Sequence, residues 1–185
     1  MAKVNNNVVT HGLSGLLGNQ IVFRAGKGGR TIVATRPVHD SNRILSPSQL
    51  AHQEAFREAI AYAKTTKDEA IYINKAQGTA MSAFNAAVAD WFNQPKVQEI
   101  DTNGWSGEIG QAIRVKAQDD VRVVKVHVVI RDTSGSVLEQ GDAEQEDGLW
   151  WVYTTTTVIS SPLTNSITAT AQDLPGNSAE FIWNN

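Results

Sequence analysis

The chain has 185 residues, a net charge of -3 and no cysteine. Its length corresponds to one ordinary domain or two small ones, and a hydrophobic content of 41% is enough for a folded core. The lack of cysteine excludes disulfides, zinc–thiolate sites and cysteine nucleophiles. No run approaches the ~20 apolar residues of a membrane-spanning helix. The first residues also lack the apolar segment of a secretion signal, so we expect synthesis in the cytoplasm.

Charge is distributed unevenly along the chain. Residues 1–45 hold six basic residues and one acidic residue, residues 46–98 hold five of each, and residues 99–185 hold five basic and thirteen acidic residues. Such an asymmetry is typical of a segment that makes interactions. Two arrangements are open at this point. Either the basic segment binds the acidic segment of another copy, or the two ends neutralise each other within one chain.

Residues 1–45 are predicted to form a glycine-rich arm with a β-hairpin. Two runs rich in β-branched residues, 20–24 and 30–35, flank a connection that contains three glycines, and glycine reaches positive φ without steric cost. A two-stranded hairpin is only marginally stable in water, so we expect it to lie on helices of its own chain or on a neighbouring subunit. The candidate assembly residues are Phe23, Arg24, Lys27, Arg30 and Arg36.

Residues 46–96 are predicted to form a small helical unit. The sequence Ser46-Pro47, with Gln49 three residues after the serine, is typical of a capped helix start, and this helix should extend to about residue 64. A second helix is expected to begin at Asp68 and to end before residue 78. A third should begin near residue 79 and end before residue 95. Its apolar stripe, interpreted as core packing, consists of Met81, Phe84, Val88 and Trp91.

Residues 97–185 change to a period of two, which predicts β-strands. Apolar residues alternate with polar ones over 113–117, and Val124, Val126, Val128 and Ile130 continue the pattern after a short break. Further short strands are predicted around 137–138, 150–157, 167–171 and 181–183. Short strands separated by turn residues are typical of an antiparallel sandwich. The predicted fold class is therefore α+β, with the arm and the helical unit preceding a β-sandwich.

The third segment resembles bacterial immunoglobulin-like repeat domains. The resemblance covers about residues 98–185 and depends on the alternating strands, on Trp151-x-Tyr153, and on the run Ala171-x-Asp173-x-Pro175-Gly176-Asn177. It implies an immunoglobulin-like β-sandwich that serves as a spacer, an adhesive module or an appendage on surface proteins and phage-type particles. It implies no catalytic residues.

The N-terminal half is similar to a group of bacterial proteins of unassigned activity. Its members begin with a G-x-S-G-x-x-G-N hairpin and continue into a T/S-x-x-Q-L helix, and here these motifs lie at residues 12–19 and 46–50. The similarity implies an association with phage-like or mobile elements. It assigns no functional residue.

Familiar catalytic patterns are missing from the sequence. The glycines around Lys27 lack the spacing of a phosphate-binding loop, and the four histidines have neither zinc-ligand spacing nor a neighbouring nucleophile. Asp119, Asp120 and the acidic run 142–147 offer carboxylate oxygens to calcium, but no D-x-D-x-D-G loop is present. Solvated acidic loops are the simpler interpretation. We therefore predict no catalytic residue, no metal site and no cofactor.

Nucleic acid is not favoured as a partner. The cations of the arm are suited to phosphate contacts, which counterion release would drive. Phe23, however, is the only aromatic residue of the arm, and the acidic C-terminal segment would repel a polyanion.

We expect a non-enzymatic structural subunit whose partners are copies of itself and other components of the same particle. A basic arm that meets an acidic surface of the next copy gives a head-to-tail contact, which builds rings or filaments. The expected setting is a phage-like particle or an extracellular filament. The alternative is a monomeric surface- or carbohydrate-binding module with an aromatic platform of Trp150, Trp151 and Tyr153. Alternation along a strand places one of the two tryptophans in the core and the other outside.

Overall fold

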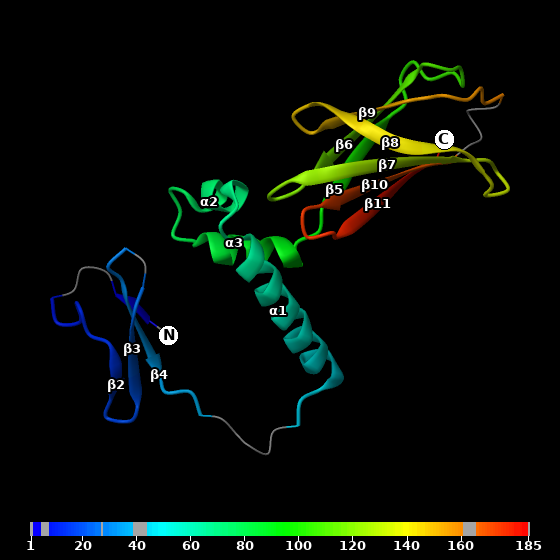
Figure 1. The fold of residues 1–185 in the computed structure, drawn as a ribbon. Coiled ribbons are helices and arrows are strands. Elements are labelled where there is room, and N and C mark those ends of the chain that lie inside the picture. The colour runs from blue at the N-terminus through cyan, green and yellow to red at the C-terminus, as the bar shows by residue number, and fades with distance from the viewer. Residues whose placement is uncertain (1, 5–7, 27, 39–43, 161–165, 185) are drawn as a thin grey trace. The chain divides into compact units, whose positions relative to one another are not determined.

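A computed structural model describes residues 2–4, 8–26, 28–38, 44–160 and 166–184 (Figure 1). Within these described ranges, four strands precede three helices and seven further strands follow, so the protein is α+β as predicted. The chain divides into two compact units, residues 1–55 with 78–80 and residues 56–77 with 81–185. No helix in the described part of the chain has the length and apolar character needed to cross a membrane.

The first unit contains an antiparallel four-stranded sheet in the order β1-β4-β3-β2. The predicted hairpin is confirmed, because β3 and β4 pair with Phe23 opposite Val33. Gly18 and Asn19 have φ angles of 56° and 57°, which makes the β2–β3 connection a tight turn that favours these two residue types. The strands are β1 (Ala2–Val4), β2 (Gly15–Leu17), β3 (Ile21–Ala25) and β4 (Thr31–Thr35).

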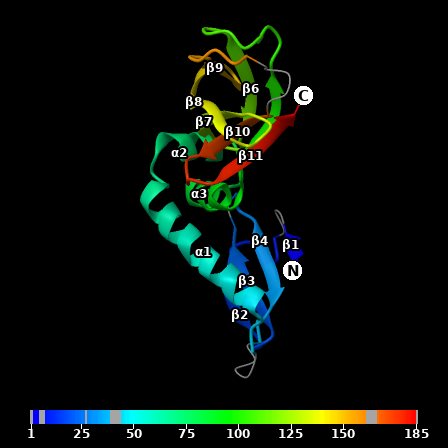
Figure 2. The ribbon, with the colours of Figure 1, turned by 90° about the vertical axis from the view of Figure 1, so that its right-hand side faces the viewer.

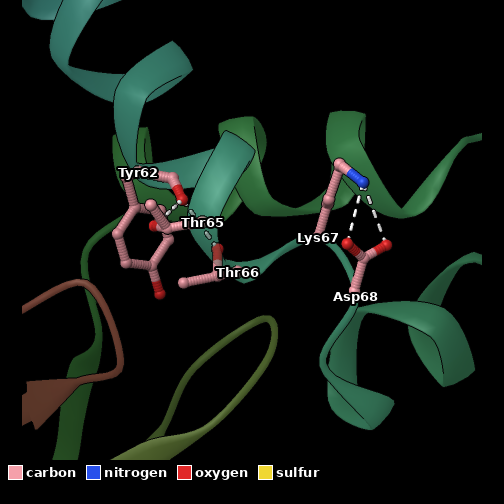
Figure 3. A network of polar contacts seen from close by, with 5 residues as sticks. All are labelled: Tyr62, Thr65, Thr66, Lys67 and Asp68. Atoms are coloured by element: carbon pink, nitrogen blue, oxygen red, sulfur yellow. Dashed lines mark hydrogen bonds and ion pairs between the residues drawn. The ribbon is translucent and has the colours of Figure 1, made fainter.

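The first helix, α1 (Pro47–Thr66), has the predicted start and ends close to the predicted position. The Ser46 hydroxyl accepts a hydrogen bond from the Gln49 amide at 3.3 Å, and the Ser46 amide donates to Gln49 Oε1 at 3.1 Å. This reciprocal pair satisfies two backbone donors of the first turn. At the other end, the hydroxyls of Thr65 and Thr66 donate to the Tyr62 carbonyl at 2.7 and 3.0 Å (Figure 3).

The other two helices are shorter than predicted. Helix α2 (Ala70–Ala76) begins after Glu69, while Asp68 forms an ion pair with Lys67 at 2.8 Å instead of capping the helix (Figure 3). Helix α3 (Ala83–Phe92) begins after Ser82, whose hydroxyl accepts from the Asn85 amide at 3.2 Å. Serine is a strong helix cap, and it fixes the start of α3 later than residue 79.

The apolar stripe that we predicted for the third helix is only partly correct. Met81 precedes α3 and is exposed, whereas Phe84 and Val88 pack against a small core. The residues that α3 buries in this core are Ala86 and Ala87. Their small side chains let α3 approach the neighbouring helices closely. The buried residues of this core are Ala63, Tyr72, Ala86 and Ala87, and partly buried neighbours include Val121 and Leu174 from connections between strands. The helices of the second unit therefore pack on one end of its sheet.

The second unit contains an antiparallel seven-stranded sheet in the order β11-β10-β7-β8-β9-β6-β5. The long strand β8 pairs with β7 through its first half and with β9 through its second half. The end strands β5 and β11 lie beside each other, so the sheet is nearly barrel-shaped (Figure 1 and Figure 2). The strands are β5 (Lys96–Asp101), β6 (Ala112–Gln118), β7 (Val123–Arg131), β8 (Val137–Asp147), β9 (Trp150–Thr154), β10 (Ser166–Asp173) and β11 (Ser178–Asn184).

The predicted alternation of apolar residues produces the main core. Its central members are fully buried and come from three strands, β6, β7 and β10: Ile113, Val115, Val126, Val128, Ile130, Ile167, Ala169 and Ala171. Trp151 and Tyr153 of β9 lie beside them. The alternation predicts Val124 on the same buried face as Val126, and this prediction is wrong. Gln172 pairs with Lys125 and Asp173 pairs with Val123, so Val124 is an extra residue in a β-bulge and its side chain points outward.

The interpretation of residues 142–147 as an acidic loop is also wrong. These residues belong to β8, where they pair with β7 and β9. Asp173, in contrast, shapes a turn. Its Oδ1 accepts from the amides of Gly176 and Asn177 at 2.9 and 2.6 Å.

A close approach at Gly141 yields a first prediction. A Cβ atom at this position of β8 would lie 2.7 Å from Cε2 of Tyr153, a buried ring. We expect Gly141→Ala to lower the free energy of unfolding by about 1–3 kcal/mol, because the ring or the strand must shift. Urea unfolding followed by tryptophan fluorescence measures the change. Gln140→Ala, at the adjacent exposed position, should stay within ~0.5 kcal/mol. Equal effects of the two variants would contradict the steric argument.

Candidate functional site

The four-stranded sheet of the first unit has apolar side chains on both faces. Residues paired across strands lie on the same face, so Leu17, Ile21, Phe23 and Val33 share one face. Leu16, Val22, Ile32 and Ala34 share the other. Where the structure describes burial in this unit, Thr31 alone is buried. Leu16 and Leu17, one from each face, are 52% and 60% exposed. This sheet, termed here the arm sheet, is the candidate functional surface.

The predicted assembly residues do not share one face of the arm sheet. Phe23 is half-buried on the face of Leu17, whereas Arg24 is exposed on the opposite face, beside Ile32. Arg30 immediately precedes β4. Arg36 follows β4, where its guanidinium donates to the side chain of Asn19 in the β2–β3 turn. Lys27 lies outside the described residues.

Positive charge therefore surrounds the apolar surface instead of forming one patch. Arg24 is on one face, and Arg30 and Arg36 flank the two ends of β4. An apolar centre with charged residues at its margin is the usual composition of a protein–protein interface. The arrangement suits association with a protein surface of opposite charge.

The three predicted aromatic platform residues are divided between the surface and the core. Trp151 and Tyr153 are 7% and 5% exposed, and Trp150 is half-buried, so one tryptophan lies in the core and the other outside as expected. The Trp150 ring is also covered. Arg114 Cζ lies 5.3 Å and Lys116 Nζ 5.7 Å from its centroid. The three residues form no common surface on which a sugar ring can stack.

Tyr153 has a structural partner in Glu139, a carboxylate buried at the start of β8. The Tyr153 hydroxyl donates to Glu139 Oε1 at 2.9 Å, and the hydroxyl of Thr156 donates to the same oxygen at 2.9 Å. The Thr156 amide is a third donor. Burial, followed by the hydrogen bond to Glu139, raises the pKa of Tyr153 to about 12. These contacts place Tyr153 in the internal structure of the sheet.

A second buried polar network connects the helices. The hydroxyls of Tyr62 and Tyr72 lie 2.5 Å apart, and the Tyr72 hydroxyl donates to Asp90 Oδ2, also at 2.5 Å. Asp90 is fully buried in α3. Burial raises the pKa of Asp90 to about 7. The Tyr72 hydrogen bond opposes this shift, and the negative charges of nearby aspartates add to it.

Sequence reasoning missed Asp90. The signal available was an aspartate in the second half of an alanine-rich apolar helix, at a position that faces the core. A charged residue at such a position is rarely buried without a partner. Its other neighbours, Asp119 and Asp120, come from the β6–β7 connection, which no spacing along the chain relates to α3.

Comparisons with known proteins add little to this site. No protein-family model matches the chain, and no curated protein matches it. An engineered protein of known structure is 23% identical with a TM-score of 0.37, and the match covers 54% of this chain and 25% of that one. A conjugative transposon lipoprotein from Bacteroides eggerthii is 13% identical with a TM-score of 0.22, over 50% of this chain and 97% of that one. At these scores neither likeness identifies a fold family or a function.

The internal role of Tyr153 yields a second prediction. Tyr153→Phe should lower the free energy of unfolding by about 1.5–3 kcal/mol, because a buried carboxylate loses a donor. Tyr62→Phe is the matched control. It removes a hydroxyl that pairs with another neutral hydroxyl, and it should cost only about 0.5–1.5 kcal/mol. Chemical denaturation measures the loss of unfolding free energy in both variants. A loss in Tyr62→Phe that equals or exceeds the loss in Tyr153→Phe would contradict the role assigned to Tyr153.

Proposed function

We propose that this protein is a non-enzymatic structural subunit that assembles head to tail through its arm sheet. One observation carries the proposal: both faces of the sheet are apolar, and no apolar side chain of the sheet is buried where the structure describes burial. A sheet without a covered face is marginal in water. Covering its exposed leucine and isoleucine side chains stabilises the sheet by roughly 25 cal/mol per Å² of apolar surface.

The proposed occupant of the arm sheet is the acidic C-terminal segment of a second copy. Residues 1–45 hold six basic residues against one acidic residue, and residues 99–185 hold thirteen acidic residues against five basic ones. Glu144 and Asp147 are exposed on β8, whereas Asp142 of the same strand is paired with Lys125 and His127. Complementary charge steers association and fixes its orientation. A contact between two different surfaces of the same protein repeats without limit unless the rotation closes a ring.

We further propose that the seven-stranded sheet is an immunoglobulin-like sandwich. If β5 to β11 are lettered A to G in chain order, the observed order is G-F-C-D-E-B-A. Immunoglobulin constant-type domains place A, B, E and D in one sheet and C, F and G in the other, which is the same set of neighbours. The β8 strand joins the two halves through its pairing with both β7 and β9. A phage-like particle component or an extracellular filament is the setting that fits such a subunit.

The alternative of a monomeric surface- or carbohydrate-binding module has lost its main support. Two of its three platform residues are buried, and cationic side chains lie over the third. Self-assembly is therefore the function that we favour.

A charge reversal on the arm sheet tests the proposal. We expect the full-length protein to self-associate with increasing concentration, and 0.5 M salt should weaken the association because exposed charges are screened. Arg24→Glu should raise the dissociation constant at least about tenfold, because an attraction becomes a repulsion. Sedimentation velocity and light scattering over a wide concentration range measure both effects.

Lys64→Glu provides the matched control, since it makes the same change of charge at an exposed position of α1 outside the arm sheet. It should leave the dissociation constant within about twofold of that of the parent protein. Circular dichroism establishes that both variants fold. A protein that stays monomeric at every concentration, or equal weakening by the two substitutions, would overturn the proposal.

A further inference from the structure

Three aspartates converge where α3 meets the seven-stranded sheet. Asp90 lies in α3, and Asp119 and Asp120 lie in the β6–β7 connection. One carboxylate oxygen of each lies within 4.8 Å of the corresponding oxygens of the other two. We call this group the carboxylate cluster. A single ion placed among three oxygens at such separations can contact all of them, since calcium–oxygen distances are about 2.3–2.6 Å.

The burial of Asp90 separates the cluster from an ordinary acidic surface patch. Asp90 is 0% exposed, and its Oδ2 accepts from the Tyr72 hydroxyl. Its Oδ1 is buried and has no hydrogen-bond partner among the described residues. The same holds for Asp119 Oδ1, whereas Asp119 Oδ2 accepts from two backbone amides of the β6–β7 connection, both at 2.9 Å. Two buried carboxylate oxygens in one cluster thus lack a donor within the described chain.

Charge in the cluster is poorly balanced. Asp173 adds a fourth negative charge close enough to act on Asp90. Among the described residues, Lys75 reaches the cluster, where its ammonium donates to the backbone carbonyl of Asp120 and not to a carboxylate. Asn93 Nδ2 donates to Asp120 Oδ2 at 3.2 Å, which is a neutral contact. Buried carboxylates are costly unless they are paired, protonated or bound to a metal.

The cluster is also accessible from solvent. A surface hollow of about 720 Å³ is lined by Asp119 and Asp120, together with residues that follow α3 and residues of β5 that include Lys96. Asp120 is exposed, whereas Asp90 is buried and does not line the hollow. An ion can therefore reach Asp119 and Asp120 through the hollow.

We propose that Asp90, Asp119 and Asp120 bind a divalent cation of the calcium type. Three carboxylates without nitrogen or sulfur ligands match a hard cation, and calcium tolerates irregular geometry with water in the remaining positions. The sequence predicted no metal site because no linear calcium loop is present. In the folded chain the ligands come from a helix and a distant strand connection, which a search for a linear motif does not find.

The bound ion would join the helices to the sheet. α3 supplies one ligand, and the β6–β7 connection supplies the other two. Cation binding therefore stabilises the packing of α3 on the sheet in addition to neutralising the cluster. This inference is independent of self-assembly, because the ligands lie outside the arm sheet.

Thermal unfolding of the full-length, chelator-treated protein with and without CaCl2 tests the proposal. At about one hundred times the dissociation constant, calcium should raise the midpoint by roughly 5–10 °C. Isothermal titration calorimetry should give one site per chain. An equal concentration of MgCl2 should produce a smaller shift, because magnesium releases its water reluctantly and demands octahedral geometry.

Two variants locate the ion. Asp120→Asn is at an exposed position, and Asp119→Asn keeps an oxygen for the two backbone amides, so both should fold and lose the calcium-dependent shift. Glu58→Gln removes one negative charge from an exposed position of α1 and should keep the full shift. The proposal is overturned if calcium leaves the parent midpoint unchanged, or if both aspartate variants respond like Glu58→Gln.

Discussion

A sheet with apolar side chains on both faces must have both faces covered from water. A single-layered sheet cannot cover either face with its own strands. This constraint applies to the arm sheet of the first unit, where Leu16 and Leu17 extend to opposite faces and both are exposed. The seven-stranded sheet solves the same problem by curling, so that its inner side chains cover one another. One unit therefore contains its own core, and the other depends on a surface that its strands do not supply.

The buried carboxylates of the second unit differ in the hydrogen-bond donors that they receive. Glu139 receives three donors from Tyr153 and Thr156, and Asp173 receives the amides and side-chain nitrogen of its own turn. Asp90 differs from both. It receives one hydroxyl, and its remaining neighbours include other carboxylates. Glu139 Oε2, like Asp90 Oδ1, is buried without a hydrogen-bond partner among the described residues, so the two sites differ in the number of donors and in the carboxylates that lie beside Asp90.

Local patterns in the sequence were sufficient for most elements. The Ser46–Gln49 capping pair and the alternation over 113–117 depend on neighbours a few residues away, and both are present in the structure. Strands of three residues, such as β2, are too short to show a period and were not predicted. The bulge at Val124 depends on pairing with β10, and the carboxylate cluster depends on packing between α3 and the sheet. Such features arise from tertiary contacts, which leave no local signature.

Asn177 lies in the connection between the last two strands, yet its side-chain nitrogen donates to the carbonyls of Trp91 and Asn93 at 3.1 and 3.2 Å. These carbonyls belong to the end of α3, where a helix has no internal donors left. The final hairpin thus completes a helix formed much earlier in the chain. During synthesis, these two carbonyls lack the Asn177 donor until this hairpin leaves the ribosome, and hydrogen exchange near the end of α3 reports on the docking of the hairpin.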